Sequence, residues 1–149
     1  MFAYAAAVGV TLRVGATEIW VRRPRAGRPG RKGFVSGKVK QNTIEAMVVA
    51  DDYGATLWCG GYRPGRMHDT TAVRVEGIHA LLDAHPQLQV LVDAGHRGLA
   101  KIHPCQATAP PWRLGPGTPP ARQIHWEAKR KHQSSHRIAV EHATAELRW

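Results

Sequence analysis

Residues 90–98 read VLVDAGHRG, and this stretch leads a buried strand directly into an acidic side chain. Its first three residues form a short apolar run of the kind found in strands that lie inside a sheet. Asp93 follows at once, and two glycines then bend the chain away from the strand direction. The pattern predicts a strand over residues 88–93 that ends in a carboxylate, and this acid needs an explanation in a chain rich in positive charge.

The composition indicates one basic domain. The 149 residues include 21 Lys and Arg against 11 Asp and Glu, which gives a formal net charge of +10, and 43% of them are apolar. That apolar content is enough for a single hydrophobic core. An excess of positive charge attracts polyanions, first nucleic acid and then an anionic membrane surface. No apolar run approaches the roughly 18 residues of a membrane span.

Cysteine and histidine usage points away from a structural zinc site. Cys59 and Cys105 stand alone, without a CxxC motif, and indicate reduced thiols in a cytosolic protein. The nine histidines are scattered, without HxH or HExxH spacing. The expected location is cytoplasmic.

Hydrophobic patterning predicts a mixed α/β domain over residues 1–149. Apolar and β-branched residues cluster in the expected strands and recur at helical spacing in the expected helices. The predicted elements are a strand at 10–21, a hairpin of 43–50 and 55–62, a helix at 69–84, the strand at 88–93 and a helix at 121–149. The opening residues are interpreted as the start of a strand or as a frayed end. Six prolines and two glycines make 104–120 an irregular loop.

A basic segment occupies residues 22–40. It holds eight Lys or Arg and no acid, and its two prolines and four glycines exclude a regular helix. With no acid in the segment to neutralise them, we expect these cations to bind the phosphates of duplex DNA. They are Arg22, Arg23, Arg25, Arg28, Arg31, Lys32, Lys38 and Lys40. An RNA-binding tail is the alternative, but no aromatic-interleaved stacking motif supports it.

In a basic chain the acids are the informative minority. Asp51 and Asp52 belong to the hairpin turn, where aspartate is favoured for its bonds to the local backbone. Three others stand at more distinctive places. Asp69 precedes the first predicted helix, Asp93 ends its strand, and Glu141 lies in the last helix.

Each of these three acids also has a purely structural explanation. Asp69 is a good N-cap, Asp93 can cap the turn that follows it, and Glu141 can pair with Arg137 four residues earlier. Taken together, carboxylates at the ends of elements around one sheet suit Mg²⁺ or Mn²⁺, which bind oxygen ligands and retain several waters. Two such ions clamp the attacking and leaving oxygens of a phosphodiester.

Four motifs occur in an order that resembles the DDE endonuclease domain of bacterial insertion-sequence transposases, in the group related to Harbinger-type elements. They are ATEIWVRRPRAGRPGRKGFVSGKVKQNTI, RPGRMHDTTAVRVEGI, VDAGHRGLA and QSSHRIAVEHATAEL. The resemblance runs from about Leu12 to Trp149. It implies an RNase H-like fold, with a mixed sheet flanked by helices. It also implies DNA cleavage and strand transfer with a divalent metal, on the element ends and the target DNA.

The resemblance also implies roles for the three acids. In that fold the second catalytic acid ends the fourth strand and the last one lies on a late helix, which are the places of Asp93 and Glu141. Asp69, in the family's HD motif, is an additional ligand or the alternative second member. The first-strand motif of the family reads Asp-Gly-Thr, and here Gly15 stands in place of its aspartate. His96 stands where the family commonly has tyrosine.

These observations predict a transposase catalytic domain whose activity is impaired by the missing first aspartate. The family's helix-turn-helix region and its downstream continuation are not found in the sequence, so a domain truncated at both ends is expected. The alternative is a catalytically dead, basic DNA-binding remnant, which would interfere with an intact full-length transposase by occupying its DNA or partner surface.

Overall fold

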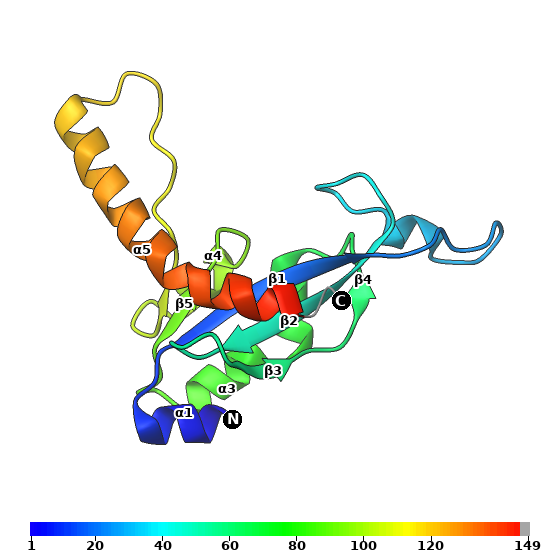
Figure 1. The fold of residues 1–149 in the computed structure, drawn as a ribbon, viewed down its shortest axis with the longest axis horizontal. Coiled ribbons are helices and arrows are strands. Elements are labelled where there is room, and N and C mark those ends of the chain that lie inside the picture. The colour runs from blue at the N-terminus through cyan, green and yellow to red at the C-terminus, as the bar shows by residue number, and fades with distance from the viewer. Residues whose placement is uncertain (147–149) are drawn as a thin grey trace.

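A mixed sheet lies at the centre of the computed structural model, which describes residues 1–146 (Figure 1). In the last helix, the side chains of residues 136, 137, 139, 140, 142–144 and 146 are outside this description. Six strands pair in the described part of the chain, in the order β3-β2-β1-β5-β6, with β4 paired to β2. They are β1 Leu12–Trp20, β2 Thr43–Ala50, β3 Thr56–Cys59, β4 Arg63–Pro64, β5 Val90–Val92 and β6 Ala107–Thr108.

The first half of the sheet is antiparallel and the second half is parallel. Strand β2 pairs antiparallel with β1, β3 and β4, while β5 runs parallel to both β1 and β6. In the parallel pair, Val14 of β1 lies beside Val92 of β5. Gly15 and Asp93 directly follow these two residues, so the end of β5 places Asp93 next to position 15.

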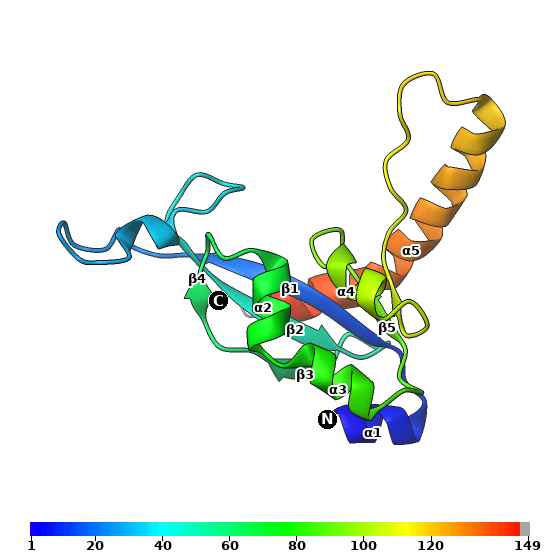
Figure 2. The same cartoon turned by 180° about the vertical axis from the view of Figure 1, so that it is seen from behind.

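Short helices cover one face of the sheet, and one long helix crosses the other (Figures 1 and 2). The short helices are α1 Phe2–Val8, α2 Asp69–Val75, α3 Ile78–Ala84 and α4 Arg97–Ile102. Helix α5, Pro120–Glu146, packs across β1 and β2 with its second half, and its first half projects away from the sheet.

The alternation of side chains along β1 explains this two-sided arrangement. Leu12 and Val14 are fully buried in the main hydrophobic core, together with Val73, Ile78 and Leu82 of α2 and α3. The residues between them on β1 point to the opposite face. The core therefore fixes which face of the sheet the short helices cover, and leaves the face of position 15 to α5.

The main predicted strands and the hairpin are confirmed, and the fold class is the mixed α/β, RNase H-like arrangement that was expected. The helix predicted at 69–84 was wrong as a single element, because Gly77 adopts φ 70° and separates α2 from α3. The opening residues were also misinterpreted, since they form α1. The last helix begins at Pro120, and residues 147–149 of the prediction lie outside the described part.

Short elements escaped prediction. Helix α4 has six residues, and β4 and β6 have two each, which is too short for a recognisable periodicity. Strand β6 interrupts the segment expected to be an irregular loop at 104–120. The basic segment contains one 3₁₀ turn, Arg31–Phe34, and is otherwise irregular, as its prolines and glycines predicted. No helix in the described residues is both long and apolar enough to cross a membrane.

Candidate metal centre

Asp93 is held at the end of β5 by two hydrogen bonds from one residue. Its Oδ1 accepts the backbone N–H of His96 at 3.0 Å and lies 2.6 Å from Nδ1 of the same imidazole. The expectation that Asp93 caps the turn after the strand is therefore confirmed. Because a carboxylate only accepts hydrogen bonds, Nδ1 is the donor, and in the neutral ring the lone pair is left on Nε2.

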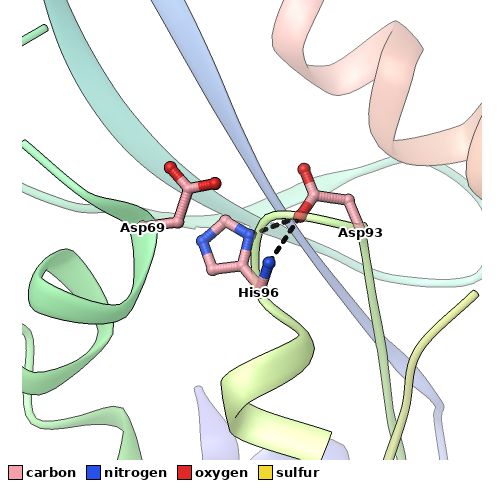
Figure 3. Close-up of side chains that lie close together, drawn as sticks. All are labelled: Asp69, Asp93 and His96. Atoms are coloured by element: carbon pink, nitrogen blue, oxygen red, sulfur yellow. Dashed lines mark hydrogen bonds and ion pairs between the residues drawn. The ribbon is translucent and has the colours of Figure 1, made fainter. Parts of the chain in front are cut away.

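The Nε2 atom of His96 is buried and has no hydrogen-bond partner among the described residues. Only 1% of His96 is exposed, so its imidazole is shielded from the bulk solvent. An unsatisfied buried polar atom costs stability and calls for an explanation, such as a ligand. Figure 3 shows the imidazole between the carboxylates of Asp69 and Asp93. One ligand atom from each of the three residues lies within 4.8 Å of the others.

Asp69 reaches this cluster from the first turn of α2. The N-cap of the helix is His68, whose side chain accepts the backbone N–H of Thr70, so the capping explanation for Asp69 was wrong. Asp69 is instead buried, with its Oδ2 directly over Gly95. A Cβ at position 95 would collide with that oxygen and would lie 3.4 Å from Asp93 Oδ1. Glycine at this position therefore gives both carboxylates room to approach.

A lysine and a third carboxylate complete the surroundings of Asp69. Lys38 Nζ lies 3.9 Å from Asp69 Oδ2, so the expectation that the basic segment has no acidic neighbour was wrong for this residue. Glu45 on β2 is buried, and its Oε1 has no hydrogen-bond partner in the part of the chain that the structure describes. Burial, followed by the nearby charge of Asp69, raises the pKa of Glu45 to about 7, and Lys38 acts in the opposite direction.

The remaining predicted acids lie elsewhere. Glu141 is exposed on α5 and is not among the three residues that cluster within 4.8 Å in the described part of the chain. Its alternative explanation, an ion pair with Arg137, lies outside the described side chains. The turn role of Asp51 is confirmed, because its Oδ1 accepts the backbone N–H groups of Tyr53 and Ala55 at 2.9 Å. Asp52, the next residue in the turn, forms an ion pair with Arg13.

The basic segment projects beyond the end of β1, where Figure 1 shows it in blue to cyan. A cavity of about 750 Å³ opens within it, and five of its eight cations line that cavity without an acid among the lining residues. These five are Arg23, Arg28, Arg31, Lys32 and Lys40. Arg22 and Arg25 are exposed nearby.

Sequence reasoning did not include His96 in the site. The available signal was the position of His96, three residues after Asp93 at the end of the strand. At this spacing a tight turn brings the later residue back beside the first. Its closeness to Asp69 depends on how α2 packs against the start of α4, and residue spacing does not contain that information.

The sheet order, with the carboxylate at the end of β5, defines an RNase H-like domain, and the sequence comparison gives its family. The chain belongs to the DDE superfamily endonucleases, whose family model matches residues 14–149. This confirms the resemblance found from the motifs. The family implies a divalent metal cofactor and DNA as the partner.

A curated relative is the "Probable transposase for insertion sequence element IS702" from Microchaete diplosiphon. It is 28% identical over 134 residues, which cover 89% of this chain and 44% of that protein. The chain therefore spans less than half the length of this relative. No solved structure matches the chain.

The raised pKa of Glu45 predicts a pH-dependent stability in metal-free buffer. Between its ordinary value of 4.5 and about 7, the unfolded chain releases this proton while the folded chain retains it. The free energy of unfolding should therefore fall as the pH rises through this window and level off above it. Glu45→Gln should remove that fall and stabilise the protein at pH 8 by about 1 kcal/mol, the scale of one unsatisfied buried polar group.

Urea unfolding at pH 5 and pH 8 in EDTA measures this effect. Glu127→Gln, which removes an exposed carboxylate on α5, is the matched control and should retain the wild-type pH dependence. A wild-type protein and a Glu45→Gln variant with the same change in stability between the two pH values would contradict the prediction.

Proposed function

We propose that the chain is the catalytic domain of a DNA transposase, which uses divalent metal to cleave element ends and join them to target DNA. The observation that carries the proposal is the cluster of Asp69, Asp93 and His96, in which Nε2 of the buried imidazole has no hydrogen-bond partner among the described residues. Family membership and the likeness to an insertion-sequence transposase support it. Such a protein would act in the cytoplasm, on DNA of the nucleoid.

The residues present fit a divalent cation. Two carboxylates supply the oxygen ligands that Mg²⁺ and Mn²⁺ prefer, and Gly95 keeps a side chain out of the space between them. Mg²⁺ takes oxygen ligands almost exclusively, so the nitrogen of His96 favours Mn²⁺ over Mg²⁺ in this chain. Glu141 is the proposed third carboxylate, presented by the helix that crosses the sheet on the face of position 15.

Each residue then has a distinct task. A bound metal would supply a nucleophile at neutral pH and stabilise charge on the phosphodiester oxygens. His96 fixes the carboxylate of Asp93 through its two hydrogen bonds, and the rigid end of β5 fixes the backbone beneath it. Lys38, 3.9 Å from Asp69, offsets the acidic charge and is placed to contact a phosphate. The rest of the basic segment holds the DNA backbone.

Gly15 lowers the activity of this copy in our proposal. Position 15 adjoins Asp93 across the β1–β5 pair, and glycine contributes no oxygen there. A nucleophile displaced by about 1 Å can lose roughly a hundredfold in rate. The same observation favours a second candidate function, a catalytically dead DNA-binding remnant that competes with an intact transposase for DNA or for partner subunits.

Restoring the aspartate tests the proposed activity. Gly15→Asp should nick supercoiled plasmid in Mn²⁺ at least about a hundredfold faster than the wild type, because it returns the missing ligand. Gly15→Asn introduces a side chain of nearly the same shape without the charge and should not increase the nicking rate. The double variant Gly15→Asp/Glu141→Gln should lose the increase that Gly15→Asp gives. Wild-type nicking as fast as that of Gly15→Asp would contradict the role given to position 15. Folded variants that all bind duplex DNA but do not cleave it would favour the remnant.

Duplex binding by the basic segment has a separate test. Arg23→Ala/Arg28→Ala removes two cations that line the 750 Å³ cavity. The logarithm of the DNA-binding constant falls with the logarithm of the salt concentration, with a slope of roughly −0.9 per phosphate contact. This variant should therefore reduce the magnitude of the slope by about 2 and weaken binding to all DNA sequences alike. Arg74→Ala/Lys101→Ala removes two exposed cations from α2 and α4 and is the matched control. Equal slopes for the two variants, measured by fluorescence anisotropy, would show that the segment is not the DNA contact.

A further inference from the structure

A second cavity, of about 710 Å³, opens beside the candidate metal centre. Its wall comes from four places: Ala94, which directly follows Asp93; Arg97 at the start of α4; the proline-rich segment at residues 110–115; and α5. Both views of the fold show the proline-rich segment and α5 projecting together from the sheet (Figures 1 and 2). We call this cavity the tryptophan–arginine pocket, after the residues described next.

Three guanidinium groups and one indole ring line the pocket. Arg97, Arg113 and Arg130 contribute positive charge against the single carboxylate of Glu127. The ring of Trp126 lies in the same wall, with the guanidinium of Arg130 centred 5.3 Å from it. Cations next to an aromatic face are the combination that binds a nucleotide, because the phosphate pairs with the guanidinium and the base stacks on the ring.

Hydrogen bonds hold the aromatic wall in place. Trp126 Nε1 donates to the backbone carbonyl of Trp112 at 2.7 Å, which fixes the indole and ties α5 to the proline-rich segment. Arg97 donates to the carbonyls of Pro110 and Pro111 at 3.2 Å, and its guanidinium lies 4.3 Å from the ring centre of Trp112. The pocket is thus largely formed before any ligand arrives, which reduces the entropy lost on binding.

Trp112, between the lining residues Pro111 and Arg113, adds a further aromatic surface beside the pocket. Trp112 is 75% exposed although it is among the largest apolar side chains in the chain. The packing of the protein itself does not explain an indole held by an arginine on the surface. A nucleic-acid base that lies against it would remove this apolar area from water, as in binding sites for single strands.

The chemistry distinguishes an unpaired nucleotide from duplex DNA. In a duplex the base faces are stacked on one another, so only phosphates could reach the arginines and the rings would be unused. A nucleotide freed from the helix presents both groups at once. The pocket adjoins Asp93, where a strand would be cut, so the nucleotide next to the cleaved bond can reach it.

We propose that the tryptophan–arginine pocket binds an unpaired DNA nucleotide next to the cleavage site. Its phosphate pairs with Arg97, Arg113 or Arg130, and its base stacks on Trp126 or Trp112. This proposal rests on the proposed function, because it takes DNA as the substrate. It adds to that function a site that distinguishes unpaired strand ends from intact duplex DNA.

Binding of three labelled DNAs to the full chain in EDTA tests the proposal without any cleavage. The DNAs are a blunt duplex, the same duplex with two unpaired 3′ nucleotides, and that overhang without its bases. Wild type should bind the overhang roughly tenfold more tightly than the other two, since stacking of one base is worth about that factor. Trp126→Ala should lose the preference and Trp126→Phe should retain part of it.

Trp20→Ala is the matched control, because this indole is 70% exposed at the far end of β1 and should not affect the preference. Arg113→Ala, on the surface of the proline-rich segment, should weaken binding of the overhang more than binding of the blunt duplex. It also provides a second variant if Trp126→Ala unfolds. Equal affinity of wild type for all three DNAs, or an unchanged preference in folded Trp126→Ala, would overturn the proposal. If wild type binds the overhang but not the blunt duplex, that result would instead count against the role of the basic segment.

Discussion

The hydrogen bonds between Asp93 and His96 are the interaction on which the candidate site depends. Parallel pairing of β5 with β1 brings Asp93 beside position 15, and the backbone N–H of His96 then fixes the carboxylate at 3.0 Å. The ring of the same residue lies between Asp93 and Asp69 (Figure 3), and its buried Nε2 finds no hydrogen-bond partner within residues that the structure describes. Gly95 is required between them because a side chain there would displace Asp69.

Charge is distributed in two zones that suit a metal-dependent enzyme acting on a polyanion. The acids Asp69, Asp93 and Glu45 are gathered at the sheet, where burial and the charge of Asp69 raise the pKa of Glu45 and the shared negative charge favours a bound cation. The cations lie outside, in the basic segment and around the tryptophan–arginine pocket, and Lys38 links the two zones. DNA held by the outer zone would lie with its backbone over the inner one.

Local patterns in the sequence predicted the longer strands, the hairpin and the position of Asp93, because an apolar run followed by an acid and a glycine describes the end of a buried strand. They did not predict the break at Gly77, since a helical spacing of apolar residues continues across it. They also did not predict the contact of Lys38 with Asp69, which depends on the path of an irregular segment. The closeness of His96 to Asp69 depends on how α2 and α4 pack together. Glu141 stays a prediction, which the motif resemblance supports.

Metal affinity tests the central claim most directly. Titration calorimetry of the full chain with Mn²⁺ should give binding that Asp93→Asn weakens by more than about tenfold, a loss on the scale seen when metal sites lose supporting groups. Asp83→Asn is the matched control, because that side chain is 72% exposed on α3, and it should bind Mn²⁺ as the wild type does. Equal Mn²⁺ affinity in wild type and folded Asp93→Asn would contradict a metal centre at the end of β5.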